Sequence, residues 1–145
     1  MKYLFLLILS SSLNLFANTV IYSSAFIDVL DRSIKKNYTI TIEDGLIKSI
    51  DKGLLKINKN DQLIDLRNYI VMPGLMDMHV HFGGEYQSKA ERPVKVERET
   101  EAILATAHAY TTLKAGFTTV RQVGDSGLVA ISLRDAIKNE YVIGP

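Results

Sequence analysis

The stretch that decides the fold is residues 73–81, which read Pro73-Gly74-Leu75-Met76-Asp77-Met78-His79-Val80-His81. Apolar and polar side chains alternate along it, so Asp77, His79 and His81 share one parity. In a β-strand, residues two apart point to the same face and lie about 6.6 Å apart. The Pro-Gly pair predicts a turn that starts such a strand.

The two histidines can converge on one metal ion only if this run is a strand. In a helix of 3.6 residues per turn, side chains two apart would lie about 200° apart around the axis. On one face of a strand, each imidazole could reach an ion at about 2.0–2.1 Å. A His-x-His pair also arises by chance or on a solvated strand edge, so the spacing alone leaves both interpretations open.

The first 17 residues are typical of a secretory signal. Lys2 gives a positive start, residues 3–9 are an unbroken apolar run, and small and polar residues lead up to Ala17. We therefore expect cleavage after Ala17 and a periplasmic or secreted product. The run is shorter than the 18 or more residues of a membrane-spanning helix, so no membrane anchor is expected. A hydrophobic first strand is the alternative.

Charge and cysteine content exclude several classes of function. The 145 residues are 47% hydrophobic, which is enough for a core, and include 17 basic and 16 acidic residues. Removal of the signal takes away Lys2 and leaves no net charge, so no nucleic-acid partner is expected. The chain contains no cysteine, which excludes disulfides and thiolate metal ligands but leaves the redox compartment open.

Residues 18–72 are expected to form a small β-sandwich or part of one. Their short β-branched and aromatic runs predict strands, and Asp44-Gly45 is a strong hairpin signal. The predicted strands are 19–27, 38–43, 46–50, 62–66 and 69–72.

Residues 73–145 are expected to alternate strands and helices. After the histidine strand come a polar loop to about residue 96, a helix over 97–115, a strand over 117–123 and a helix over 128–139. This order predicts βαβ units and a parallel sheet. The buried stripe expected on the first helix is Ile103, Ala107, Tyr110 and Leu113.

Residues 72–81 resemble the first barrel strand of the amidohydrolase superfamily, whose signature is Pro-Gly-apolar-apolar-Asp-x-His-x-His. Residues 42–50 (Ile-Glu-Asp-Gly-Leu-Ile-Lys-Ser-Ile) resemble its N-terminal hairpin, and 113–121 (Leu-Lys-Ala-Gly-Phe-Thr-Thr-Val-Arg) resemble the entry into its second barrel strand. Gly144-Pro145 matches a feature of the imidazolonepropionase-like and Xaa-Pro dipeptidase-like branch. The resemblance implies an α/β fold with an N-terminal β-sandwich portion and an incomplete (β/α)8 TIM barrel of two βα units.

The resemblance also implies a metal-dependent hydrolase of C–N bonds in amide, peptide-like or cyclic amide substrates. His79 and His81 would hold a divalent metal, zinc above all, with one or two ions in the full-length enzyme. The partner would be a small-molecule or dipeptide-like substrate, and association into a homo-oligomer stays open. In this family the metal activates water by lowering its pKa to about 7.

Three more residues are candidates beside the metal or the substrate. Asp77 could orient an imidazole or make a structural hydrogen bond beneath the site. Arg121 and Asp125 lie at or beyond the C-terminal end of the second barrel strand, where barrels present functional groups, although a local Arg–Asp pair is the alternative. His108 falls within a helix and is expected to be packed or solvated rather than a ligand.

The family completes its site with a lysine, two histidines and an aspartate from later strands. We expect these catalytic residues beyond residue 145, so the chain is predicted to be the N-terminal portion of an enzyme and inactive alone. Two imidazoles are one ligand short of the three that catalytic zinc sites use. A non-catalytic β-sandwich binding module with a degenerate βα remnant is the alternative.

Overall fold

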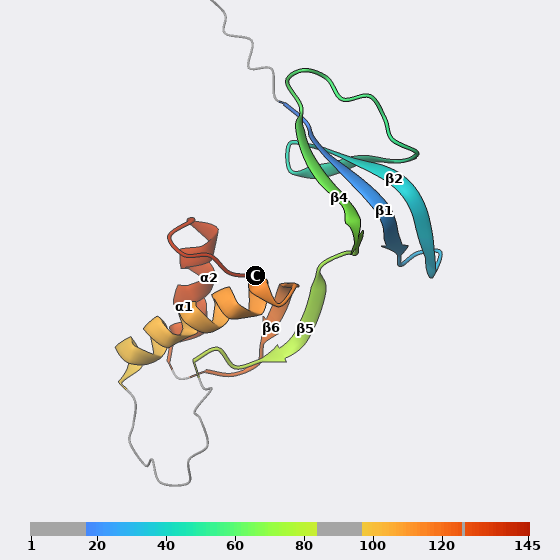
Figure 1. Cartoon of the computed structure of the whole chain (residues 1–145). Coiled ribbons are helices and arrows are strands. Elements are labelled where there is room, and N and C mark those ends of the chain that lie inside the picture. The colour runs from blue at the N-terminus through green and yellow to red at the C-terminus, as the bar shows by residue number, and fades with distance from the viewer. Residues whose placement is uncertain (1–16, 84–96, 126) are drawn as a thin grey trace, which may run out of the picture. The chain divides into compact units, whose positions relative to one another are not determined.

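The computed structural model describes residues 17–83, 97–125 and 127–145, which form two compact units, one ending at Pro73 and one beginning at Gly74 (Figure 1). The predicted signal lies outside the described residues except for Ala17, as does most of the predicted loop after the histidine strand. Among the described residues, no helix has the length and apolar character needed to cross a membrane.

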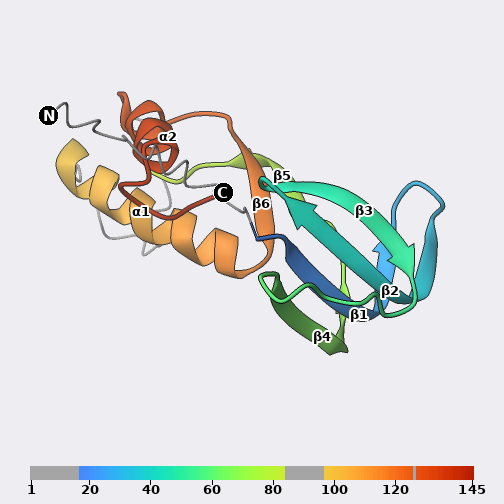
Figure 2. The same ribbon diagram turned by 90° about the horizontal axis from the view of Figure 1, so that it is seen from above.

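From residue 17 onward, the N-terminal unit forms a four-stranded sheet in the order β3-β2-β1-β4, which Figure 2 shows from above. Its strands are β1 (Thr19–Asp28), β2 (Ser33–Glu43), β3 (Leu46–Lys52) and β4 (Gln62–Val71). β1 runs antiparallel to β2 and parallel to β4. Asp44 and Gly45 have φ values of 51° and 76° between β2 and β3, which confirms the predicted hairpin.

One expectation for this unit is wrong. Residues 62–66 and 69–72, predicted as two strands, form the single strand β4. Its pairing with β1 shifts register between Ser23 and Ala25, so an irregularity within one strand takes the place of the expected break. The described residues of this unit make one sheet, and the second layer that would complete a sandwich is not among them.

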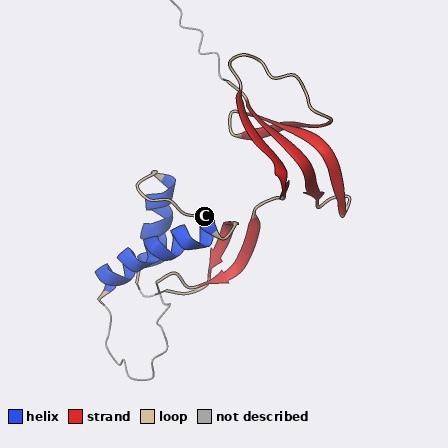
Figure 3. Ribbon diagram, in the orientation of Figure 1, coloured by secondary structure: helices blue, strands red, loops and turns tan. Residues whose placement is uncertain are grey.

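The described residues of the C-terminal unit form two strands and two helices, which Figure 3 colours red and blue. They are β5 (Leu75–Val80), α1 (Arg98–Lys114), β6 (Phe117–Gln122) and α2 (Val129–Lys138). β5 and β6 are parallel, as a helical crossover between them requires. The βαβ prediction is therefore confirmed, while the barrel to which such a unit would belong stays a prediction.

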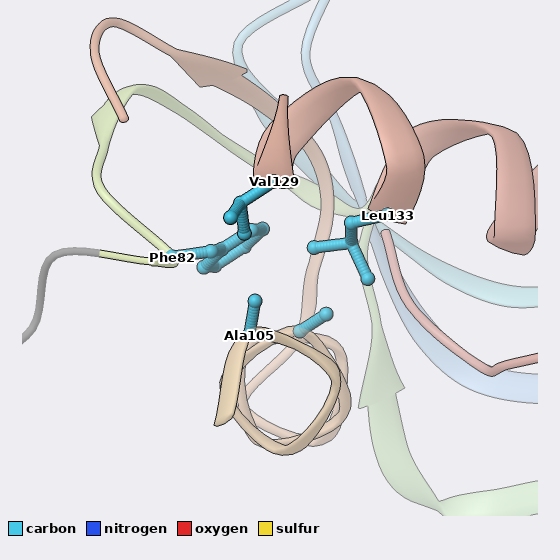
Figure 4. Close-up of a cluster of buried hydrophobic side chains, with 5 residues drawn as sticks. Phe82, Ala105, Val129 and Leu133 are labelled. Carbon is cyan, nitrogen blue, oxygen red and sulfur yellow. The ribbon is translucent and has the colours of Figure 1, made fainter. Parts of the chain in front are cut away.

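The core of this unit lies between α1, α2 and the end of β5 (Figure 4). Its buried members are Phe82, Ala105, Ala109, Val129 and Leu133. The stripe predicted for α1 is wrong, because Ile103 is 71% exposed and Tyr110 is 49% exposed. The fully buried Ala105 and Ala109 face the core instead, since their small side chains allow α2 and Phe82 to approach α1 closely.

Candidate metal centre

The two imidazoles converge at the end of β5. Val80 packs against the core of the unit, and its exposed neighbours His79 and His81 bring their rings together. The two Nε2 atoms are 3.2 Å apart, with ring centroids 5.2 Å apart and ring planes at 64°. This convergence is the arrangement that alternation along a strand predicts.

The separation of the two nitrogens fits one small metal ion. With zinc–nitrogen bonds of about 2.0–2.1 Å, Nε2 atoms 3.2 Å apart subtend an angle of about 100–105° at the ion. Tetrahedral zinc prefers an angle near 109°. The pair can therefore donate to one ion without any rearrangement of the backbone.

A backbone carbonyl fixes which nitrogen of His81 is available. The Nδ1 of His81 lies 2.7 Å from the carbonyl oxygen of Gly124. A carbonyl can only accept, so Nδ1 carries the hydrogen and donates it. In the neutral ring, Nε2 then carries the lone pair and accepts from His79 Nε2, 3.2 Å away, until a metal takes that place. Metal-binding histidines are commonly oriented in this way by a bond at the other ring nitrogen.

Asp77 binds the backbone rather than a ring in this structure. Its Oδ1 accepts a hydrogen bond of 2.9 Å from the backbone N–H of His79. The carboxylate therefore holds the strand in place immediately before the two imidazoles. Of the two roles considered from the sequence, this contact corresponds to the structural hydrogen bond.

Arg121 and Asp125 lie in different surroundings. Asp125 accepts a hydrogen bond of 3.0 Å from the N–H of Gly83, and its Oδ2 is buried with no hydrogen-bond partner among the described residues. Arg121 lines a separate cavity of about 630 Å³ with side chains of α2, including Arg134. Within the described ranges, no ion pair joins Arg121 to Asp125, in contrast to the local pair considered from the sequence.

Side chains that the sequence analysis did not single out as functional hold the segment after His81. His108 on α1 donates from Nδ1 to the carbonyl of Phe82 at 2.9 Å. Gln122 accepts from the N–H of Phe82 at 3.1 Å and donates to the carbonyl of Gly124 at 2.7 Å. No sequence motif marked Gln122 or Gly124, because their contacts depend on the folded pairing of β5 with β6.

A cavity of about 660 Å³ opens beside the imidazole pair. Its wall includes Asp77, His79, His81 and His108, together with Thr111 and Thr112 of α1. This volume is in the range of small-molecule sites. Polar and ring groups thus border a space large enough for a small ligand.

The described residues supply two candidate metal ligands, His79 and His81. Within 17–83, 97–125 and 127–145, no group of three His, Cys, Asp or Glu residues is placed to hold a metal ion. Catalytic zinc sites use three protein ligands, so a working centre needs at least one donor from outside this set.

The chain is similar to several characterised hydrolases. It is 56% identical to a Xaa-Pro dipeptidase whose crystal structure contains methionine in the active site; the match has a TM-score of 0.84 and covers 89% of this chain and 32% of that one. It is 41% identical over 59 residues to the dihydroorotase of Carboxydothermus hydrogenoformans, covering 34% of this chain and 14% of the relative. It is 36% identical over 59 residues to the imidazolonepropionase of Clostridium tetani, covering 38% and 14%.

These matches cover only part of the length of each relative, and one family unites them. The chain spans about a third of the length of the dipeptidase and about a seventh of the two other relatives. The family model for the amidohydrolase family matches residues 70–145, more than half of the chain, including the histidine pair and both helices. This chain belongs to the amidohydrolase family.

Proposed function

We propose that this chain contributes His79 and His81 as metal ligands to an enzyme that hydrolyses C–N bonds. The observation that carries the proposal is the pair of Nε2 atoms 3.2 Å apart, with His81 Nδ1 already bonded to Gly124. Family membership supports the reaction class. The remaining ligands would come from outside the described residues, in keeping with the threefold greater length of the similar dipeptidase.

The residues of this chain would hold and orient the centre. A divalent ion, zinc above all, supplies Lewis acidity when bound: it polarises a carbonyl and lowers the pKa of water to about 7. The Gly124 carbonyl accepts the Nδ1–H of His81, which leaves the lone pair of Nε2 to bind the metal. Asp77 fixes the backbone of His79. The adjoining cavity of about 660 Å³ would admit a small amide.

The substrate proposed is a dipeptide with C-terminal proline. The 56% identity to a Xaa-Pro dipeptidase extends over 89% of this chain and supports cleavage of the peptide bond to the ring nitrogen of proline. We expect the zinc-loaded protein that contains this chain to release proline from Xaa-Pro dipeptides, as measured by amino-acid analysis, and to lose this activity on chelation. Dihydroorotate serves as the competing substrate. Preference for dihydroorotate would contradict the substrate, and chelator-insensitive hydrolysis would contradict the metal role.

We propose that the protein is exported, on the strength of the charged start and apolar run of its first 17 residues. Expressed in a Gram-negative host, the mature protein is expected in the periplasm with Asn18 as its first residue, as N-terminal sequencing would determine. Leu7→Arg, which places a charge in the apolar run, should keep the protein in the cytoplasm. A cytoplasmic product of the unsubstituted gene that retains Met1 would refute export.

A further inference from the structure

We propose that Gln122 is a positioning residue for the metal ligand His81. It acts through the Gly124 carbonyl, which receives the Nδ1 hydrogen of His81. This role rests on the proposed metal function of His81. It adds a residue at the end of β6 whose side chain determines the orientation of a ring at the end of β5.

The Gly124 carbonyl oxygen joins the two side chains. It accepts from His81 Nδ1 at 2.7 Å and from Gln122 Nε2 at 2.7 Å. A carbonyl oxygen has two lone pairs, so these two bonds satisfy it fully. Because Gln122 occupies one lone pair, the carbonyl is held with its other lone pair toward the His81 ring.

The other end of the same amide is anchored in the core. Gln122 Oε1 accepts from the backbone N–H of Phe82 at 3.1 Å, and Phe82 is 8% exposed within the hydrophobic cluster. The carbonyl of Phe82 is bonded to His108 on α1. The amide therefore has one possible orientation, since its oxygen must meet an N–H and its nitrogen must meet a carbonyl.

The location explains why a side chain is needed here. The β5–β6 pairing shifts register between Asp77 and Val80, and its last pair joins Val80 to Gln122. The Val123 N–H still donates to the Val80 carbonyl at 3.2 Å, but in the described part of the chain no strand pairing follows that would hold His81 itself. Gln122 supplies two side-chain hydrogen bonds here. One is accepted from the N–H of Phe82, the residue after His81, and the other is donated to the Gly124 carbonyl, which accepts from the His81 ring.

Two substitutions separate the two bonds. Gln122→Met keeps the length of the side chain but removes both the donor and the acceptor. Gln122→Glu keeps an acceptor for the Phe82 N–H but removes the donor to Gly124, because an ionised carboxylate only accepts. Gln62→Met is the matched control, since Gln62 is an exposed residue on β4 in the other unit.

The first measurement needs no metal. Long-range ¹H–¹⁵N spectra of the full chain at about pH 8, where free imidazole is neutral, report which nitrogen of His81 carries the hydrogen. We expect Nδ1–H in the unsubstituted chain and in Gln62→Met, and a mixture of both tautomers in Gln122→Met and Gln122→Glu. In Gln122→Glu the Phe82 amide should stay protected from hydrogen exchange. That result would separate the orientation of His81 from simple loss of structure.

The second measurement is a zinc titration of the protein that contains this chain, followed by the Nε2 signals of both histidines. Zinc affinity of Gln122→Met is expected to fall about 10- to 100-fold, as for other residues that orient metal ligands. If folded Gln122→Met bound zinc as tightly as the unsubstituted protein and kept the Nδ1–H tautomer of His81, the positioning role alone would be overturned. If Gln122→Met does not fold, the His81 tautomer in Gln122→Glu decides instead. No zinc binding by the unsubstituted protein that contains this chain, with its remaining ligands present, would overturn the proposed function and the positioning role together.

Discussion

Replacement of both His79 and His81 by alanine is expected to abolish zinc binding and amide hydrolysis in the protein that contains this chain. The two Nε2 atoms lie 3.2 Å apart, and no group of three or more His, Cys, Asp or Glu residues among the described residues could hold the ion in their place. Loss of an outer partner alone weakens metal binding about 10- to 100-fold, so loss of two ligands should exceed about 100-fold. Zinc content per chain after dialysis, determined by mass spectrometry, measures the effect.

His108→Ala is the matched control for this experiment. His108 donates to the Phe82 carbonyl and lines the same cavity as the pair, but it is not one of the two facing Nε2 ligands. The folded control should retain its zinc, although its melting temperature should fall. If the double variant kept one zinc per chain, or if His108→Ala lost as much zinc, His79 and His81 would not be the ligands.

Gly74→Ala is expected to destabilise the C-terminal unit strongly, by about 3 kcal/mol or more. A Cβ at this position would lie 1.9 Å from Thr118 Oγ1 and 2.7 Å from Thr118 Cβ. Rotation of the Thr118 side chain removes the first clash but not the second, so β5 would have to move away from β6. Overpacking of this kind lowers the free energy of unfolding by about 1–3 kcal/mol. Because the backbone must also move, we expect a decrease at or above the upper end of this range. Urea unfolding monitored by circular dichroism gives the value.

Two further variants test the cause of this loss. Gly124→Ala is the control, because its Cβ would meet only His81 atoms at 3.6 Å or more, an ordinary contact. Thr118→Gly, combined with Gly74→Ala, removes every clashing atom and should recover part of the stability. A Gly74→Ala protein within about 0.5 kcal/mol of the unsubstituted one would show that the strands do not approach this closely.

Much of the C-terminal unit is predictable because its signals are local. Alternation over residues 73–81 identifies a strand and places both histidines on one side of it, and the two rings do converge. Acidic residues in the first turn and the glycine after the last turn predict a helix over 97–115. The observed bounds of α1, Arg98–Lys114, differ by one residue at each end. Gly116, with φ of 97°, is the residue that the chain reversal after α1 requires.

The contacts that support the site could not be predicted, because they join distant residues. Gln122 reaches Phe82 across 40 positions, and His108 reaches the same residue across 26. Their formation depends on how β5, β6 and α1 pack, which no spacing in the sequence encodes. The buried face of α1 was wrongly predicted for a related reason. Large apolar residues suggested the core side, whereas close helix packing selected Ala105 and Ala109.

The most direct test is a crystal of the zinc-loaded protein measured on both sides of the zinc absorption edge. An anomalous peak is expected about 2.0–2.1 Å from the Nε2 atoms of both His79 and His81, with His81 Nδ1 still bonded to the Gly124 carbonyl. A zinc peak that is not bound to both His79 and His81, or coordination of His81 through Nδ1, would contradict the proposed metal centre.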